Sequence, residues 1–353
     1  MVAVTIWIPF LMLILLGYSF GGAISHVPIA VVRDSYGASS ISLLDILQAE
    51  QSCQFGGVNC QNSFQLVNVG DLDAAQDMLR ESSVKAVVYV PPGYDAASGT
   101  GEVIAYLDTT DPSTAGTVSA ELTQASQQLS IQASSVKDPQ PNLVLTSLYQ
   151  NISYIEYMAP SSAILAITYA SAIGGGVTLL EDRKGGIIEG YLVTPLERYE
   201  IILGVILAGT VKALLSAGGM LLLAILIAGV HPRVDLLGAA LMLVALVLTA
   251  LGIISMITVA GIRASSPDVL RFLIAPIVLI LYFTSGATYP VQGLPGWMRE
   301  IAIVNPETYA FHALRLLMYK GTSLAAITGD LIFLTAFTFV MVVASTLAFR
   351  RSL

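Results

Sequence analysis

The stretch Leu236–Ile262 reads LLGAALMLVALVLTALGIISMITVAGI and contains no charged residue. A helix that crosses the roughly 30 Å hydrocarbon core of a bilayer needs roughly 20 apolar residues, and this run exceeds that length. Surface helices of soluble domains carry a polar face, which this run lacks. The stretch therefore predicts a transmembrane helix.

The rest of the chain repeats this pattern. Of its 353 residues, 55% are hydrophobic and 11% are charged, which leaves too little polar surface for an ordinary soluble globule. A cleaved signal peptide is the alternative for the first apolar run, but no basic residue precedes it. We predict an α-helical polytopic membrane protein with six transmembrane helices. The other apolar runs are Val4–Phe20, Met158–Leu180, Ile201–Val230, Phe272–Ala287 and Leu331–Phe349.

Residues 25–157 differ in composition from the apolar runs around them. This segment contains fourteen acidic and four basic residues, although the net charge of the whole chain is only −8. Short runs rich in Val and Ile, such as Lys85–Val90, alternate with helical stretches, such as a polar helix near Ala115–Ser130. We expect an α/β or α+β domain inserted between the first helix, 1–24, and the other five, 158–353. It has no GxGxxG motif, metal-ligand cluster or catalytic constellation.

The distribution of Lys and Arg between the short loops predicts the orientation. One side has seven basic residues and the other has four, so we expect domain 25–157 outside the cell and both termini in the cytoplasm of a plasma-membrane protein. The first group is Arg183, Lys184, Arg198, Arg263, Arg271, Arg350 and Arg351, and the second is Arg233, Arg299, Arg315 and Lys320.

The two cysteines of the chain, Cys53 and Cys60, both lie in the predicted outer domain. An oxidising compartment permits a disulfide between them, and closing so short a loop stabilises a protein by about 2–3 kcal/mol. The alternative is a pair of free thiols. The spacing is not CxxC, which argues against redox catalysis.

The segment between the second and third spans mixes charged and apolar residues, a composition typical of a segment lying along a membrane surface. It runs from Glu181 to Leu192. Thr194-Pro195-Leu196-Glu197 follows as a capping box with Pro at the first helical position, which predicts that the third helix begins there. A helix start with positive-inside charges is the structural alternative to a functional role.

This segment carries a family resemblance. Glu181-Asp182-Arg183-Lys184-Gly185, followed by Tyr191-Leu192-Val193-Thr194-Pro195-Leu196, resembles the cytoplasmic loop of ABC type-2 exporter permeases. A second match is Gly293-Leu294-Pro295-Gly296-Trp297-Met298 with Val304–Arg315, which looks like the outer re-entrant hairpin of that family, here 290–328. The resemblance covers nearly the whole chain in order. It departs at the start, because such permeases usually open with a basic elbow helix before the first span, and Met1-Val2-Ala3 contains none.

The resemblance implies that the chain is the permease subunit of an ATP-driven exporter. A phosphate loop requires a Gly-Lys pair, and the chain has none, so ATP hydrolysis would belong to a separate ABC ATPase chain. The permease would pair with a second permease chain, identical or different, in the lipid bilayer, without cofactor, metal or nucleic acid. By resemblance, the coupling residues would be Glu181, Asp182, Arg183, Lys184, Gly185, Ile187, Ile188 and Leu192, in the loop 181–196.

The second match also predicts a short helix from Pro306 to Lys320. Asn305 is a good N-cap, Pro306 suits the first helical position, and Gly321 ends the helix. The helix is interpreted as an outer gate or as an interfacial anchor, with Glu307 on a polar side. Its candidate gate residues are Asn305, Pro306, Tyr309, Ala313 and Arg315.

Lys212 is the single charge inside a predicted span and indicates a pathway residue or a side chain that reaches toward an interface. Gly174-Gly175-Gly176 favours close helix approach over a bend. Two rival functions remain: a receptor or sensor, which would need a cytoplasmic output domain, and an ion-driven secondary transporter, which would favour internal repeats. The sequence does not discriminate among hydrophobic drugs, lipids, glycan precursors, peptides and sodium ions as the cargo.

Overall fold

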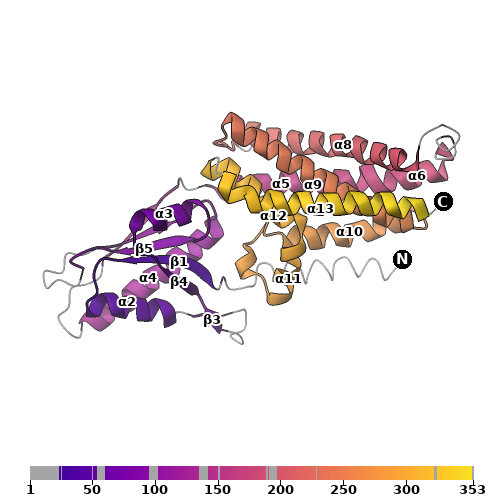
Figure 1. Ribbon diagram of the computed structural model, residues 1–353. Helices are drawn as coiled ribbons and strands as arrows, with labels where there is room; N and C mark the ends of the chain where they lie inside the picture. The colour runs from indigo at the N-terminus through magenta and orange to yellow at the C-terminus, as the bar shows by residue number, and fades with distance from the viewer. Residues whose placement is uncertain are drawn as a thin grey trace. The chain divides into compact units, whose positions relative to one another are not determined.

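The computed structural model describes residues 24, 26–49, 51–53, 60–94, 102–134, 142–149, 152–187, 190, 197–227, 229–321 and 324–351 (Figure 1). These residues form two compact units, a sheet unit that ends at Tyr157 and a helical unit that begins at Met158. The short segment Gln292–Pro295 groups with the sheet unit. The first predicted span, Val4–Phe20, lies outside the described residues and stays a prediction.

The sheet unit contains a mixed five-stranded sheet in the order β4-β1-β5-β6-β7. Strand β1 is parallel to β4 and β5, β6 is antiparallel to β5, and β7 is parallel to β6. Parallel strands need crossover connections, and three helices supply them. The strands are β1 Val27–Arg33, β4 Phe64–Asn68, β5 Ala86–Val90, β6 Glu102–Leu107 and β7 Asn142–Ser147, and the helices are α2 Ala38–Ala49, α3 Leu72–Arg80 and α4 Pro112–Ser134.

Strand β1 lies in the interior of the sheet because its side chains are apolar on both faces. Ala30 and Val32 on one face pack with Ala75 and Leu79 of α3 and with Val87 of β5. The alternate residues of β1 on the other face are also buried. Continuous apolar strands of this kind are typical of sheets covered on both faces, so the short Val- and Ile-rich runs of the sequence become the core of the sheet unit.

A second, two-stranded ribbon brings the two cysteine positions together. Strands β2 (Gln51–Cys53) and β3 (Cys60–Asn62) are antiparallel, and the register sets Cys53 directly opposite Cys60. The connecting residues 54–59 lie outside the described residues. The backbone pairing is the arrangement that a disulfide between these positions requires, and the disulfide itself stays a prediction.

The helical unit contains five helices that are long and apolar enough to cross a membrane. The first is one continuous helix, 154–184, in which a π-helical turn, η1, separates α5 from α6. These five helices confirm the predicted spans after the first one. Their bounds are α5 Tyr154–Ala172, η1 Ile173–Val177, α6 Thr178–Lys184, α8 Arg198–Leu226, α9 Leu236–Arg263, α10 Pro267–Thr284 and α13 Leu324–Arg351.

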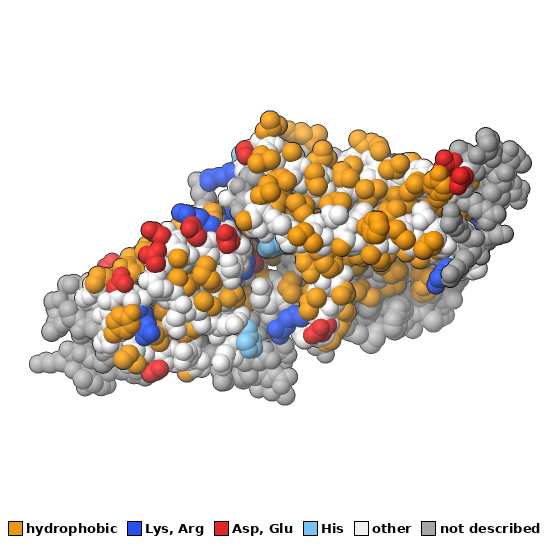
Figure 2. Space-filling model, in the orientation of Figure 1, with side chains coloured by type: hydrophobic (Ala, Val, Ile, Leu, Met, Phe, Trp, Pro, Cys, Tyr) orange, Lys and Arg blue, Asp and Glu red, His pale blue; other side chains and the backbone are white. Residues whose placement is uncertain are grey.

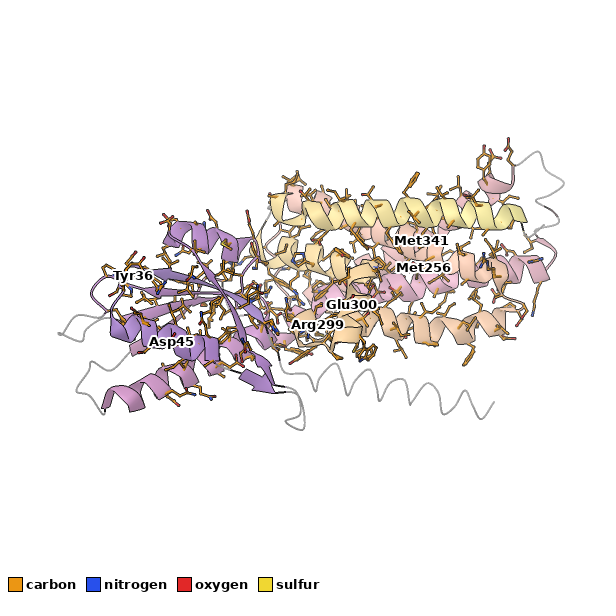
Figure 3. The ribbon with its side chains drawn as sticks, turned by 60° about the horizontal axis from the view of Figure 1, so that its bottom comes forward. Tyr36, Asp45, Met256, Arg299, Glu300 and Met341 are labelled. Carbon is orange, nitrogen blue, oxygen red and sulfur yellow. The ribbon has the colours of Figure 1, made fainter. Side chains whose placement is uncertain are left out.

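The outer surface of this unit is apolar. Figure 2 shows hydrophobic side chains over the visible faces of the helices. Leu215 of α8 and Phe339 of α13, for example, are 72% and 70% exposed. In the interior, α9 packs against α13, and Met256 and Met341 mark these two helices in Figure 3. An apolar exterior around a packed helical interior fits a protein whose solvent is lipid.

Glycines allow three helices to cross closely. A Cβ atom at Gly261 of α9 would lie 2.6 Å from the Cα of Gly176, and one at Gly209 of α8 would lie 3.0 Å from the carbonyl oxygen of Gly174. Both of these contacts are with backbone, and a Cβ atom at Gly209 would also lie 2.0 Å from Cδ1 of Ile254 in α9. The predicted close approach at Gly174-Gly175-Gly176 is confirmed, and the same residues also form the π-helical turn η1.

The segment between α10 and α13 folds into short helices. It contains η2 (Val291–Gly293), α11 (Gly296–Val304), α12 (Pro306–Arg315) and a π-helical end, η3 (Leu316–Lys320). Arg299 and Glu300 in Figure 3 mark α11. Helix α12 packs against α9 and α13. The predicted helix from Pro306 to Lys320 is confirmed, and Gly321, with a φ of 91°, ends it.

Candidate functional site

The end of α6 carries the charged residues of the predicted coupling segment. Arg183 and Lys184 are exposed in the last turn of the helix. Gly186 has a φ of 73°, which glycine adopts without strain, and it turns the chain out of the helix after Gly185. Among the described residues, neither Arg183 nor Lys184 forms an ion pair. Two cations therefore stand at a helix end with their charges available to a partner.

Glu181, one turn earlier, is bound within the chain. Its Oε1 accepts a hydrogen bond from the guanidinium of Arg271 in α10. Arg271 also contacts Asp268 at 3.2 Å. Half of each side chain is exposed, 53% for Arg271 and 52% for Glu181, so the pair adds little stability. It joins the end of α6 to the start of α10.

The remaining predicted coupling residues are only partly described. Ile187 is 48% exposed, whereas Ile188, Leu192, Thr194 and Pro195 lie outside the described residues. Their roles stay predictions.

The start of the third span differs from the sequence-based prediction. We expected the helix to begin at Thr194-Pro195, with Glu197 as the third helical residue. In the structure, Glu197 is the N-cap of α8, and it forms a capping box with Glu200, whose carboxylate accepts from the Glu197 N–H at 2.8 Å. The pair Glu197 and Glu200 has the same three-residue spacing as the predicted pair Thr194 and Glu197. The pair that comes later in the sequence forms the capping box of α8.

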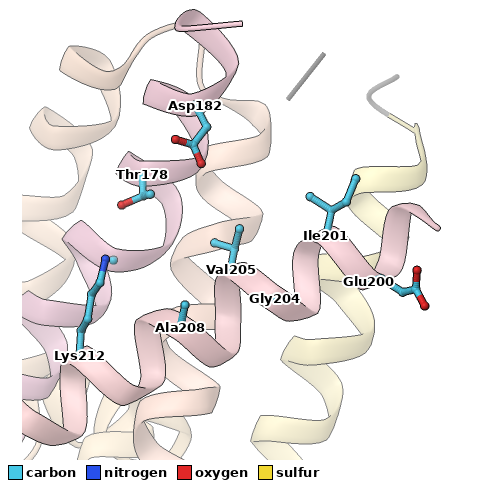
Figure 4. Close-up of a pocket in the computed structure, with 9 residues that line it drawn as sticks. Thr178, Asp182, Glu200, Ile201, Gly204, Val205, Ala208 and Lys212 are labelled. Atoms are coloured by element: carbon cyan, nitrogen blue, oxygen red, sulfur yellow. The ribbon is translucent and has the colours of Figure 1, made fainter. Parts of the chain in front are cut away.

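A cavity of about 320 Å³ lies between the 154–184 helix and α8. The charged side chain of Lys212 faces it from α8 and points toward Thr178 (Figure 4). Asp182 and Glu200 line it near the end that carries Arg183. The predicted pathway residue Lys212 thus shares a cavity with two acidic residues of the same unit. The full lining is Gly174, Thr178, Asp182, Glu200, Ile201, Gly204, Val205, Ala208 and Lys212.

Helix α12 is held at its start by Asn305. The Asn305 Oδ1 accepts from the Glu307 N–H at 2.9 Å, and its Nδ2 donates to the carbonyl oxygen of Leu281 and to Thr284 of α10. Pro306 takes the first helical position, as predicted. The N-cap therefore fixes the helix against α10 as well as starting it.

Glu307 is buried, in contrast to the predicted polar side. The side chain is fully inaccessible, and its Oε1 accepts from the Thr168 hydroxyl of α5 at 2.6 Å. Its Oε2 has no hydrogen-bond partner within the described part of the chain. The prediction was wrong because the helical pattern shows only that Glu307 lies off the apolar face, and its partner Thr168 is 139 positions away along the chain.

The other predicted gate residues also pack inward. Ala313 is buried, the Tyr309 ring stacks on Phe333 of α13 with 3.8 Å between ring centroids, and the Arg315 guanidinium lies 4.0 Å from the Phe311 ring centroid. His312 Nδ1 lies 2.8 Å from an oxygen of Asp330 in α13. A helix with contacts on so many sides is a packed element of the unit, which disfavours the interpretation as an interfacial anchor.

Sequence reasoning missed Arg271, Thr168 and Asp330 as partners of the candidate residues. Arg271 and Thr168 lie far along the chain from their partners, and no local pattern links any of the three residues, basic, hydroxyl or acidic, to its partner. Among the described residues, no group of His, Cys, Asp or Glu could hold a metal ion.

Comparison with known proteins gives one family. Residues 1–347 match the family model described as ABC-2 family transporter protein. The chain is similar to the probable doxorubicin resistance ABC transporter permease protein DrrC of Mycobacterium tuberculosis, with 22% identity over 218 residues. This alignment covers 60% of this chain and 78% of DrrC. It is also similar to the inner membrane transport permease YhhJ of Escherichia coli, with 26% identity over 192 residues. That alignment covers 53% of this chain and 50% of YhhJ.

Proposed function

The chain belongs to the ABC-2 family of transporter proteins, and from this premise we propose that it exports a hydrophobic or amphipathic substrate by alternating access. Such a chain is the transmembrane subunit of an ABC transporter in a cell membrane. It is not itself catalytic, because ATP hydrolysis belongs to a separate subunit. What remains to be proposed is the direction of transport, the class of substrate and the route by which ATP hydrolysis moves this chain.

The coupling surface is the end of α6. Arg183 and Lys184 stand exposed in its last turn, and in this proposal acidic groups of the ATPase subunit pair with them. Ile187 adds an exposed apolar contact beside the two cations. The exposed cationic turn is the single observation in the chain that carries the coupling assignment. In this proposal the ATPase, and with it the cytoplasm, lies at this end of the helices.

The helix that carries this turn also reaches the predicted gate. The continuous helix 154–184 has Arg183 near one end and Thr168 in its middle, and Thr168 contacts Glu307 of α12. A displacement of α6 by the ATPase would therefore act on α12 through one continuous helix, 154–184. Switching of this kind needs two packed arrangements with different contacts in each. In this proposal two permease chains, identical or different, close and open a pathway between them.

Export is the direction supported by the relatives. The name of DrrC refers to doxorubicin resistance, and resistance to a drug is typical of efflux. From DrrC we carry over to this chain only the class of cargo, a hydrophobic or amphipathic molecule. This class suits the helical unit, which has an apolar exterior and a cavity lined by both basic and acidic side chains. Both termini would lie in the cytoplasm and the sheet unit outside the cell.

Charge reversal at the coupling surface tests the proposal. The variant Arg183→Glu with Lys184→Glu should lose the bound ATP-binding cassette protein when the complex is purified from membranes, with at least a tenfold loss of transport into inverted vesicles. Arg263→Glu, an exposed cation at the end of α9, is the matched control. The coupling assignment is wrong if the reversed variant retains its ATPase and transports at the parental rate.

A further inference from the structure

Lys212 lies at the middle of a membrane-spanning helix. It is fourteen residues from either end of α8, Arg198 and Leu226, which at helical rise is about 21 Å from each. Half of the hydrocarbon core is about 15 Å thick, so the ammonium group of this side chain does not reach bulk water past either end. A charge at this depth faces a partner or a polar cavity. Among the described residues, Lys212 has no ion-pair partner, and its side chain is exposed at the surface of the unit, where it lines the cavity.

The cavity places acidic groups on one side of this cation. Side chains of a helix lean toward its N-terminus, and Lys212 accordingly points toward Thr178 and the end of α8 that carries Glu200 (Figure 4). Because Gly174 and Gly209 touch, they set the two antiparallel helices in register. The Cα atoms of Lys212 and Asp182 are then separated by about 16 Å along the helices at 1.5 Å per residue. The Lys212 side chain covers part of that distance, which leaves room for a small charged group on each side of Thr178.

We propose that this cavity binds the head group of a zwitterionic amphiphile. Its anionic group, such as a phosphodiester, would lie against Lys212 and Thr178, and its ammonium group would lie nearer Asp182 and Glu200. This inference rests on the proposed function, because it names the substrate class of the same transporter. The cavity volume of about 320 Å³ suits such a head group, since small-molecule sites begin at about 300 Å³.

The charge pattern selects this ligand over simpler ones. An anionic amphiphile without an ammonium group would satisfy Lys212 but would face the two carboxylates. A cationic amphiphile would satisfy the carboxylates and leave Lys212 unpaired at the middle of the membrane. A ligand that carries both charges pairs its anionic group with Lys212 and its ammonium group with Asp182, while the carboxylate of Glu200, which already accepts from the Glu197 N–H, adds negative charge at the edge of the cavity.

The surface beside the cavity is suited to the apolar part of the ligand. Leu207, Val211 and Leu215 form an exposed stripe on α8, at 58%, 57% and 72% exposure. Each position is spaced by one helical turn from the next, so the stripe is continuous. It adjoins the cavity-lining residues Ala208 and Lys212. An acyl chain could follow this stripe while the head group occupies the cavity.

Binding to the purified full chain tests the inference without the ATPase. The probes are fluorescent short-chain phosphatidylethanolamine and phosphatidylglycerol, titrated in detergent. We expect phosphatidylethanolamine to bind at least tenfold more tightly, Lys212→Met to lose that binding, and Lys212→Arg to keep it. Asp182→Asn should reduce phosphatidylethanolamine binding to the level of phosphatidylglycerol. Arg263→Ala is the control.

The opposite outcomes overturn the inference. Equal binding of the two lipids would show that the carboxylates do not contact the ligand, and unchanged binding by Lys212→Met would show that Lys212 pairs with something else, such as a second permease chain. Free phosphoethanolamine distinguishes the source of the head group. If it competes as well as the lipid, the ligand is a soluble zwitterion and not an amphiphile. Loss of the ATPase partner in the charge-reversal experiment would leave these lipid results unaffected, so the two proposals fail separately.

Discussion

Arg271 of α10 donates a hydrogen bond to Glu181 of α6, so the end of the second span is tied to the start of the fifth. The two residues are 90 positions apart in the sequence. Both are half exposed, and exposed ion pairs contribute about 0.2–1 kcal/mol to stability. The contact is therefore weak as a stabilising element, and its effect is to hold the α6 turn, with Arg183 and Lys184, against α10.

Removing this contact should lower transport more than stability. We expect the free energy of unfolding of Glu181→Gln and of Arg271→Gln to stay within about 1 kcal/mol of that of the parent protein. Each variant should transport several-fold more slowly, because the α6 turn is no longer held. The double variant should be no slower than the slower single variant, as residues that act through one contact are not additive. Thermal unfolding in detergent and uptake into inverted vesicles measure the two effects. Asp268→Asn, the other partner of Arg271, is the control, and multiplying losses in the double variant would contradict the idea.

The glycine crossing should be sensitive to a single methyl group. A Cβ atom at Gly261 would lie 2.6 Å from the Cα of Gly176, so Gly261→Ala should separate α9 from the 154–184 helix and destabilise the unit by about 1–3 kcal/mol. Gly218→Ala is the matched control, because a Cβ atom at Gly218 would have no neighbouring atom within 4 Å. Its replacement should be neutral or stabilising by up to about 1 kcal/mol, because alanine favours the helix. Melting temperatures of the purified variants compare the two, and equal losses would show that close approach is not the cause.

The sequence predicted the spans because their signal is local. An uncharged run such as Leu236–Ile262 indicates a membrane helix whatever surrounds it, and α9 ends at Arg263, the first charge after the run. The strand Asn142–Ser147 was missed. It is an edge strand of the sheet, and its apolar run, Leu143–Leu145, is only three residues long, which is too short to predict a strand by itself.

Side-chain partners were not predictable in the same way. Thr168 and Glu307 are 139 positions apart, and neither residue alone indicates that the other is near. A glutamate in the first turn of a helix is ordinarily solvated and favoured by the helix dipole, so Glu307 was placed on a polar side. Its burial depends on how α12 packs against α5, which no local pattern encodes.

The cysteine ribbon makes a redox prediction. Cys53 stands directly opposite Cys60 in an antiparallel pair. Residues so placed have Cα atoms about 4.5–5.5 Å apart, and the usual Cα–Cα separation in a disulfide is about 4.4–6.8 Å. We expect protein purified from membranes to resist thiol alkylation until it is reduced, as mass spectrometry of the labelled chain would show. Cys53→Ser and Cys60→Ser should each lose about 2–3 kcal/mol of stability. Full labelling without reductant would exclude the disulfide.

Glu307 should be required for its shape and its hydrogen bond. The side chain is fully buried and contacts Thr168 at 2.6 Å, so Glu307→Ala removes that bond and leaves a void, at a cost of about 1–3 kcal/mol. Glu307→Gln keeps the size of the side chain and an oxygen that accepts from Thr168, so it should unfold near the parent. Thermal unfolding in detergent distinguishes the two variants. Glu300→Ala on α11, an exposed glutamate of the same segment, is the control for loss of a carboxylate.

Transport assays distinguish a role of Glu307 in gating from a role in packing alone. If α12 follows the 154–184 helix through Thr168, then Thr168→Val should slow transport as much as Glu307→Ala does, because each removes the Thr168–Glu307 hydrogen bond between the two helices. Valine has the shape of threonine without its hydroxyl, so the packing of α5 is preserved. A Thr168→Val protein that transports at the parental rate, while Glu307→Ala does not, would assign Glu307 to the stability of the unit and not to its movement.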